Sequence, residues 1–461
     1  MNRLSCVLAI ILVLYVMLSA CLEETGGAGR TAAGDSAAET NTGGVPSSMS
    51  PGAEGDTELS YTAGTKISTA ESHSGHSYLS TVADQNALRI DTSDFVSITV
   101  PAVSKTGDSD GGDKCSFYGL NAAVLVKGGS TTVIAGGTVT SDANGANGVF
   151  CYGGNGGQNG ASGDGATVMI SDTVITTTGD GSGGIMTTGG GVTKATNLNV
   201  FTSGQSSAAI RTDRGGGAVT VDGGTYTTNG LGSPAIYSKA DISAANASLV
   251  SNLSEGVVIE GKNSITLTNV DLTANNTQCY GNAAFLDTVL IYQSMSSDAD
   301  RGTSRFAMTG GSLTNKNGHV FHVTNTNAVI DLCDVTIVNT DDENILLSVC
   351  ADGWRGADNI ATLNASAQAI SGAVLVGSDS TLALTLTDNS SFEGRIGGNI
   401  VDASGQTVST EVGTAIVTLD SGSTWTLTGD SYITSFSGDA ENVIGNGYTL
   451  YVNGTALCGT G

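Results

Sequence analysis

The sequence predicts an all-β protein that folds as a parallel β-helix, a solenoid, and three observations support this prediction. Glycine is abundant, with 66 Gly against only 4 Pro, and only 13% of the residues are charged. A short phrase that alternates small polar and branched apolar residues recurs after residue 60. A second apolar phrase lies between its copies. A repeat of about 20 to 30 residues without helix-forming stretches is typical of a solenoid that buries thin apolar layers.

The first phrase has the period-two alternation of a β-strand. In Thr266-Leu267-Thr268, one side chain points inward and its neighbours point outward. Glycine and asparagine follow at the corners, where they accept the positive φ of a sharp bend. The clearest copies begin at Val168, Val219, Ile242, Ile265, Phe306, Val329, Leu384 and Val417. The steps from 219 to 242, from 242 to 265 and from 306 to 329 are each 23 residues.

The second phrase adds another short strand to each repeat. Its copies are Ala209-Ile210-Arg211, Ala235-Ile236-Tyr237, Val258-Ile259-Glu260, Leu290-Ile291-Tyr292 and Val320-Phe321-His322. Each repeat therefore supplies about three strands, and the chain makes about a dozen turns, which span about 60 Å at the strand spacing of a sheet. A meander of hairpins is the alternative, but two-residue Asn-Gly turns do not join these strands.

The N-terminus predicts an export signal. Arg3 precedes a nearly unbroken apolar run from Leu4 to Leu18, which is shorter than the roughly 20 residues of a membrane span. The run ends in Leu18-Ser19-Ala20-Cys21, which resembles the bacterial lipobox. The resemblance implies that Cys21 receives a lipid and becomes the first residue of the mature chain. An ordinary secretory signal with an incidental cysteine is the alternative.

Four segments follow from these features. Residues 1–20 are a lipoprotein signal peptide, and residues 21–60 are a flexible tether rich in Gly, Ser, Thr and Ala. Residues 61–395 form the β-helix, and residues 396–461 form its C-terminal turns and cap. The protein is then exported and held by its lipid at the extracellular face of a bacterial cell membrane.

The charge balance limits the choice of partners. The chain has 17 Lys and Arg against 43 Asp and Glu, a formal net charge of −26. A surface this acidic repels the phosphates of nucleic acid, so we expect no nucleic-acid partner. It attracts cations, Ca²⁺ above all, although acidity that merely keeps a long β protein soluble explains the composition more simply.

Six cysteines remain after the leader and Cys21. They are Cys115, Cys151, Cys279, Cys333, Cys350 and Cys458. An even number in an exported protein permits disulfides, and Cys333 and Cys350 are close enough in sequence to face each other across adjacent turns. Free thiols stacked in the core are the alternative. The sequence contains no C-x-x-C pair, which disfavours zinc binding and thioredoxin-type chemistry.

The stacked phrases between about residues 90 and 455 resemble the secreted right-handed parallel β-helix proteins of the pectin-lyase-like superfamily. The similarity is closest in style to adhesin-like and carbohydrate-binding surface proteins. It rests on segments such as 233–242 and 256–265. The resemblance implies a single-stranded right-handed parallel β-helix but does not define the function, because lyases, hydrolases and inert stalks share this fold.

Catalytic patterns of that superfamily are poorly matched. Asn339-Thr340-Asp341-Asp342 compresses two hydrolase motifs, while the histidine motif at Gly318-His319 comes before them instead of after. A lyase would need a basic residue near acids, and Arg211 with Asp213, followed by Glu260 and Lys262, is the best local set. An exposed ladder of ion pairs explains that set more simply. His73 with His76, and His319 with His322, have metal-like spacing but are interpreted as surface or edge histidines.

The candidate ligand face combines charged and aromatic residues of the second phrase. Tyr237 and Tyr292 are interpreted as equivalent outward positions beside Arg211 and Glu260, and such a column is what a glycan groove requires. We therefore expect a non-catalytic, lipid-anchored module that binds polysaccharide or another cell surface. A polysaccharide lyase or hydrolase is the first alternative and a structural spacer the second. Isolated packing of the aromatic residues is the simpler interpretation of the column.

The lipidation hypothesis predicts the behaviour of one substitution. Cys21→Ser removes the thiol that accepts the lipid, so the protein should lose incorporation of an alkyne-tagged fatty acid and pass from the membrane fraction to the medium or periplasm. Cys6→Ser, within the leader, should leave both properties unchanged. Equal labelling of the Cys21→Ser variant and the parent would contradict the hypothesis.

Overall fold

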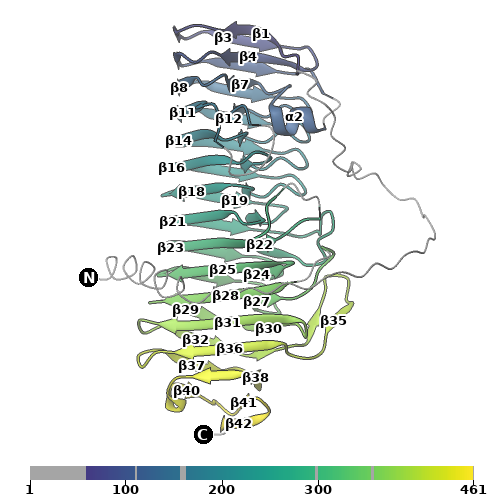
Figure 1. Ribbon diagram of the computed structural model, residues 1–461, viewed down its shortest axis with the longest axis vertical. Helices are drawn as coiled ribbons and strands as arrows, with labels where there is room; N and C mark the ends of the chain where they lie inside the picture. The colour runs from purple at the N-terminus through teal and green to yellow at the C-terminus, as the bar shows by residue number, and fades with distance from the viewer. Residues whose placement is uncertain (1–58, 110–111, 156–161, 296–298, 355–357, 460–461) are drawn as a thin grey trace, which may run out of the picture. The chain divides into compact units, whose positions relative to one another are not determined.

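The computed structural model describes residues 59–109, 112–155, 162–295, 299–354 and 358–459 (Figure 1). Contacts divide the chain into residues 1–57 and residues 58–461, and all described residues belong to the second unit. The expected leader, Cys21 and nearly all of the expected tether lie outside the described residues. None of the described helices is long and apolar enough to cross a membrane.

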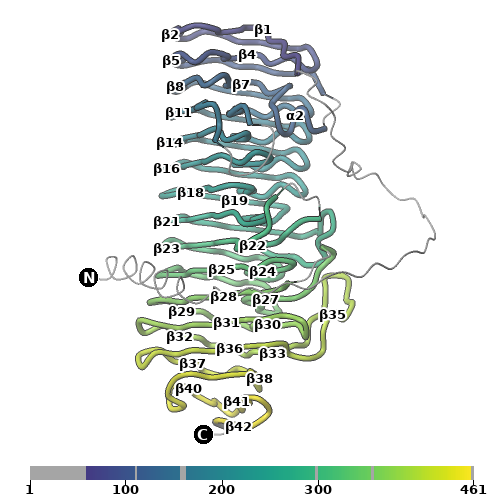
Figure 2. The backbone as a smooth tube through the Cα atoms, viewed as in Figure 1, coloured from purple at the N-terminus to yellow at the C-terminus, as the bar shows by residue number. Residues whose placement is uncertain are grey.

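The first sheet is entirely parallel and takes one strand from each turn. Its thirteen strands in spatial order are β1 (Thr62–Ile67), β4 (Gln85–Asp91), β7 (Val124–Lys127), β10 (Val149–Tyr152), β13 (Ile185–Thr188), β15 (Ile210–Thr212), β17 (Ile236–Ser238), β20 (Val257–Glu260), β22 (Asp287–Tyr292), β24 (His319–Thr324), β27 (Ile345–Val349), β30 (Ala373–Val376) and β33 (Ile396–Gly397). Because chain order and spatial order agree, the chain advances by one turn at a time (Figure 2). The predicted all-β parallel solenoid is therefore confirmed.

The second sheet has twenty strands and takes up to two from each turn. They are β2 (Glu71–Ser74), β3 (Ser77–Ser80), β5 (Phe95–Thr99), β6 (Ala102–Lys105), β8 (Thr131–Ala135), β9 (Thr138–Ser141), β11 (Thr167–Ser171), β12 (Val174–Thr177), β14 (Gly191–Thr202), β16 (Gly217–Thr228), β18 (Asp241–Ala245), β19 (Ser248–Ser251), β21 (Ser264–Ala274), β23 (Thr303–Asn315), β25 (Thr326–Cys333), β26 (Thr336–Asn339), β28 (Asn359–Ser366), β31 (Ser380–Thr387), β36 (Thr414–Leu419) and β39 (Ser435–Ser437). The long strand β14 pairs with both β11 and β12, so two strands of one turn merge into one in the next.

The remaining elements are short. A third parallel sheet holds β29 (Ala369–Ser371), β32 (Ser391–Gly394), β37 (Thr424–Leu427) and β40 (Val443–Ile444). The pair β34 (Ile400–Val401) and β35 (Thr407–Ser409) is antiparallel and projects beside β30 (Figure 1). Near the C-terminus, β38 (Ser431–Ile433) pairs with β41 (Thr449–Val452), which pairs antiparallel with β42 (Thr455–Gly459). The described helices are α2 (Asp113–Tyr118) and the 3-10 turn η2 (Ala440–Asn442).

The alternation in the sequence places the core between the sheets as expected. Ile265 and Leu267 are fully buried, while Thr266 and Thr268 are exposed. Ile242, Ile265 and Phe306 are aligned on successive strands of the second sheet and belong to one continuous apolar core. Each turn thus adds a thin apolar layer, and burial of each layer depends on its neighbours.

A row of left-handed residues forms one corner of the solenoid. Asp172, Asn197, Asn246 and Asn269 have φ between 51° and 54°. The side-chain nitrogen of Asn197 donates to the carboxylate of Asp172 over 2.8 Å, so adjacent turns are joined at this corner. At the corresponding bend of β16, Gly224 has φ 93°, and a Cβ there would lie 2.3 Å from the carbonyl oxygen of Leu198. The corner therefore favours Asn, Asp and Gly, although Val100 and Ala367 also adopt φ 50° in this row.

The register corrects two alignments made from the sequence. Phe306 pairs with Ile330 instead of Val329, so that step is 24 residues and keeps both buried side chains in the core. In the first sheet, Tyr237 pairs with Val258, and it is Glu260 that pairs with Tyr292. Tyr237 and Tyr292 are therefore not equivalent positions, although a two-residue offset leaves both on the same face.

Most of the described cysteines form no disulfide. These are Cys115, Cys151, Cys279 and Cys350, whereas Cys333 is disulfide-bonded. The suggested pairing of Cys333 with Cys350 is therefore wrong, and the side chain of Cys458 lies outside the described part. Burial raises the pKa of the Cys151 thiol to about 12, so this thiol stays protonated in the core.

The layered core predicts a strong contrast between two neighbouring positions. Leu267→Ala removes a fully buried side chain and should lower the free energy of unfolding by about 2–5 kcal/mol. Thr266→Ala, one residue away but exposed, should change it by less than about 0.5 kcal/mol. Urea unfolding of the two variants measures the difference. Equal losses would contradict the assigned inward and outward faces.

Candidate functional site

The candidate site lies on the outer side of the first sheet, where β15, β17, β20 and β22 are adjacent. On each strand an isoleucine points into the core, as Ile236 and Ile259 do, and the next residue points away from it. Arg211 and Tyr237 are paired across two strands, and Glu260 and Tyr292 across the next two. Residues two places further on share this outer side. The strand register therefore collects side chains from four consecutive turns.

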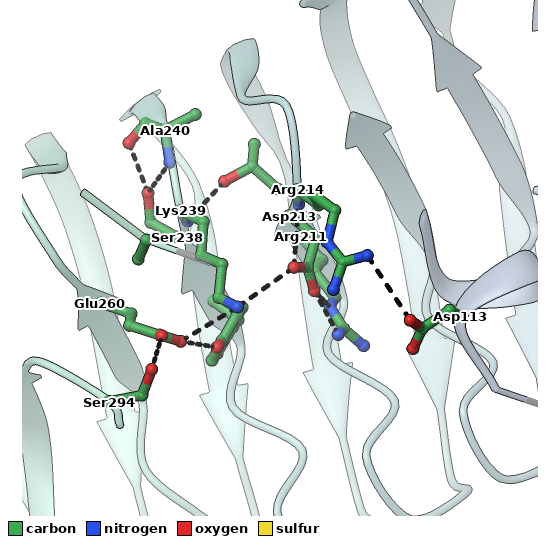
Figure 3. A network of polar contacts seen from close by, with 12 residues as sticks. Asp113, Arg211, Asp213, Arg214, Ser238, Lys239, Ala240, Glu260 and Ser294 are labelled. Atoms are coloured by element: carbon green, nitrogen blue, oxygen red, sulfur yellow. Dashed lines mark hydrogen bonds and ion pairs between the residues drawn. The ribbon is translucent and has the colours of Figure 1, made fainter. Parts of the chain in front are cut away.

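Charged residues of alternating sign form a chain across these strands (Figure 3). The guanidinium of Arg211 lies 2.5 Å from a carboxylate oxygen of Asp213. The Lys239 ammonium lies 3.3 Å from Asp213 and 3.4 Å from Glu260, so it bridges the two acids. Asp213 and Glu260 are each 1% exposed and Lys239 is 5% exposed. The predicted exposed ion-pair ladder is therefore wrong, because this network is buried.

Glu260 is the centre of the hydrogen bonding. Its carboxylate accepts hydrogen bonds from the hydroxyls of Tyr237 and Ser294, and from that of Tyr292 over 3.0 Å. Burial, and next the negative charge of Glu260, raise the pKa values of Tyr237 and Tyr292 well above normal. Both phenols therefore stay protonated and donate. The carboxylate thus fixes two aromatic rings on β17 and β22, the strands on either side of its own strand β20.

A pocket of about 230 Å³ opens beside this network. Aromatic side chains line much of it, namely Tyr237, Tyr280, Tyr292 and Trp354. The rings of Tyr292 and Trp354 lie 4.5 Å apart, and the Arg211 guanidinium lies 5.3 Å from the centre of the Tyr237 ring. Within the described chain, the buried indole nitrogen of Trp354 has no hydrogen-bond partner. The pocket thus combines aromatic faces with a few polar groups.

The loop that follows β21 forms the rim. The hydroxyl of Tyr280 lies 2.9 Å from the side-chain nitrogen of Gln205 and 2.9 Å from the hydroxyl of Ser206. Its ring lies over Gly232, where a Cβ would be only 2.2 Å from a ring carbon. A side chain at position 232 would therefore displace the tyrosine, so glycine is needed at this position.

The structure brings together most of the predicted face. Arg211, Asp213, Tyr237, Glu260 and Tyr292 form one network. Lys262 stands apart, because its half-exposed ammonium pairs with Asp300 at 3.0 Å.

Sequence reasoning missed Lys239 and Ser294. Both were detectable, since each follows a predicted tyrosine by two residues and must share its strand face. Trp354 comes from a loop after β27, and no periodicity placed it beside Tyr292.

Two acids are buried beneath the pocket. Glu255 lines the pocket and is 7% exposed, and Asp287, at the start of β22, is 1% exposed. Burial raises the pKa of both carboxyls, and that of Asp287 is raised further by the charge of Glu255. One carboxyl oxygen of Asp287 has no hydrogen-bond partner among the described residues. Burial therefore shifts both groups toward the protonated form.

The second histidine pair, His319 and His322, differs from the predicted surface or edge position. His319 and His322 are 5% and 0% exposed, and the Nδ1 atoms of both lie 2.7 Å from the hydroxyl oxygen of Ser348. They are interior residues, not surface residues, and their side chains meet instead of pointing apart. His322 Nε2 also lies 3.3 Å from Asp352, but Ser348 is fully buried and cannot meet a substrate in this state.

The first pair fits its expected setting more closely. His73 is part-buried, with Nδ1 2.7 Å from the hydroxyl of Tyr78 and Nε2 2.8 Å from the carboxylate of Glu71. The possible hydrolase acid Asp341 caps a turn by accepting backbone hydrogen bonds from Gly318 and Glu343. No three His, Cys, Asp or Glu side chains among the described residues are grouped so as to hold a metal ion.

Comparison of the chain with protein-family models, with curated proteins and with solved structures found no match.

The buried Asp287 predicts a specific dependence of stability on pH. Its pKa is raised in the folded state, so the folded protein holds a proton that the unfolded chain loses above about pH 4. Its contribution to stability is therefore present below that pH and is lost as the pH rises. Asp287→Asn should reduce the fall in melting temperature between pH 4 and pH 7.

The exposed Asp271 supplies the control. Its carboxylate accepts a hydrogen bond from Ser312, which an asparagine oxygen can also accept, so Asp271→Asn should keep the parental slope. A slope for Asp287→Asn equal to that of the parent would show that Asp287 is ionised in the fold.

Proposed function

We propose that this protein binds carbohydrate in the pocket formed by Tyr237, Tyr280, Tyr292, Trp354 and Arg211, without catalysis. The observation that carries the proposal is the convergence of four aromatic side chains and one guanidinium on a single hollow. Aromatic faces pack against the C–H faces of a sugar ring, while a few fixed polar groups select its hydroxyls. The volume of about 230 Å³ suits one sugar ring at a time.

The buried network supports binding because it fixes the pocket before a ligand arrives. Glu260 holds two tyrosine hydroxyls, and Lys239 holds Glu260, so the rings need little ordering when a sugar binds. A preordered site loses less entropy on binding.

The same contacts favour binding over catalysis. A glycosidase needs one carboxyl to protonate the leaving oxygen and a second to activate water or attack. In this pocket Glu260 is saturated by three hydroxyls and a lysine, and Lys239 is held between two carboxylates. Neither group is therefore poised to transfer a proton to or from a ligand.

We further propose that the solenoid is exported and held at the outside of a bacterial membrane by a lipid on Cys21. The apolar run that ends in Leu18-Ser19-Ala20-Cys21 supports this location. The adhesive role follows from the two proposals together, because a tethered module that binds glycans attaches its cell to another surface. A polymer, rather than a free sugar, is the ligand class that suits this role.

A glycan array run with and without Ca²⁺ tests the binding proposal. The parent should bind a defined set of glycans, and Trp354→Ala and Tyr292→Ala should each weaken that binding at least tenfold, about 1.4 kcal/mol. Tyr432→Ala is the matched control, because Tyr432 is a 46% exposed tyrosine that stacks on Tyr451 near the C-terminus. It should bind like the parent.

Two outcomes would contradict the proposal. Release of unsaturated, ultraviolet-absorbing products from pectic polymers would show a lyase. Absence of binding to every glycan in both conditions would leave a structural spacer.

A further inference from the structure

A second hollow, distinct from the aromatic pocket, lies where the β34–β35 hairpin meets the solenoid. Its volume is about 530 Å³, and its walls come from residues 285–286, 316–319, 340–343, 401–403 and 405. The hairpin is tied to the loop after β21, since the backbone N–H of Ala403 donates to the carbonyl of Ala284 over 2.9 Å. The hollow is thus bounded by three turns of the solenoid and one projecting hairpin.

The charge of this hollow is strongly negative. Asp341, Asp342, Glu343 and Asp402 line it, against the single cation Lys316. Asp341 and Asp402 use carboxylate oxygens to cap nearby turns. In the described parts of the chain, no hydrogen bond or ion pair engages the carboxylates of Asp342 and Glu343, and both residues are exposed. Acids clustered on a turn are ordinary by themselves, but the wall of this hollow has a second polar feature.

That feature is the imidazole of His319 in the wall of the hollow. The side chain of His319 is only 5% exposed, and its Nδ1 lies within hydrogen-bond distance of the Ser348 hydroxyl on the inner side. Its Nε2 has no hydrogen-bond partner among the described residues, yet it is not sealed off from solvent as the Nε2 atom of His322 is. Since His319 lines the hollow, its unpartnered nitrogen is offered to whatever occupies that space.

The protonation of the cluster defines what this nitrogen can do. Burial, the largest cause, lowers the pKa of His319 to about 3, so this ring stays neutral, with a proton on one nitrogen and a lone pair on the other. The Nδ1 atoms of His319 and His322 both lie 2.7 Å from the Ser348 hydroxyl, which can donate to only one of them. When the Nδ1 of His319 is the one that donates to Ser348, its Nε2 carries the lone pair, and this tautomer can accept a hydrogen bond from a ligand.

We propose that this acidic hollow is a binding site for a small organic cation, an ammonium or guanidinium group. The positive charge of such a group would pair with the carboxylates of Asp342 and Glu343. Its N–H groups would donate a hydrogen bond to the lone pair of His319. A nitrogen and carboxylates could also ligate a metal ion, but no three His, Cys, Asp or Glu side chains of the described residues are grouped to do so. The hollow lies within the usual 300–1,000 Å³ range of small-ligand sites.

Calorimetric titration of the full chain with agmatine, which carries both groups, tests the proposal. Agmatine should bind with one-to-one stoichiometry, and putrescine and methylguanidine should show which of its ends is recognised. The uncharged 1,4-butanediol should not bind. The paired substitution Asp342→Asn with Glu343→Gln should weaken agmatine binding at least tenfold, and Lys316→Ala should strengthen it by removing a competing charge.

A control pair separates a site from the general attraction of an acidic protein. Asp241→Asn with Asp271→Asn removes the same two charges from exposed positions on the second sheet, and it should change affinity less than twofold. His319→Gln should also weaken binding, and because it disturbs the interior, the ¹⁵N shift of His319 in the parent provides an independent measurement. A protonated Nε2, equal losses in the two acid pairs, or binding of CaCl₂ in place of agmatine would overturn the proposal.

Discussion

Parallel, in-register pairing of the first sheet is the constraint on which the candidate site depends. Arg211 pairs with Tyr237, Tyr237 pairs with Val258, and Glu260 pairs with Tyr292. In such a ladder a side chain is fixed by its position on the strand, and a slip of one residue would turn it into the core. In the second sheet, a row that includes Asp172, Asn197, Asn246 and Asn269 at positive φ places the bend at the same position in successive turns.

Buried charge is the cost of this arrangement. Asp213, Lys239 and Glu260 lie in a nearly dry layer, where an unpaired charge would be strongly destabilising. Each acid is met by a cation, and Glu260 is also met by three hydroxyls. The gain is in geometry, since the network holds the tyrosine rings of the pocket at fixed positions. The second hollow follows the opposite design, with exposed acids that no described side chain neutralises.

Much of the fold was accessible from the sequence because its repeat is local. The alternation around Leu267 and the glycine corners predicted parallel strands, an apolar core and about a dozen turns. The two-residue offset at Glu260 was not accessible, because the phrases of β17 and β20 look alike and only the whole ladder defines the register. The merging of strands in β14 was equally hidden.

The candidate site was predictable only where it lies on strands. Arg211, Asp213, Tyr237, Glu260 and Tyr292 share a face by their spacing, and the structure brings them together. Trp354 and Tyr280 come from loops, whose positions depend on contacts far apart in sequence. Burial of the histidines was missed for the same reason, since the loop after β21 brings Phe285 within 4.6 Å of the His322 ring and so covers it.

The central claim is that the outer side of β15, β17, β20 and β22 holds the carbohydrate. A crystal structure of the protein with a glycan that the array identifies tests this claim most directly. The account predicts one sugar ring packed on Trp354 and Tyr292, with the rings of Tyr237 and Tyr292 and the Lys239 bridge unmoved from the unliganded state. A glycan bound elsewhere, with this pocket empty, would contradict it.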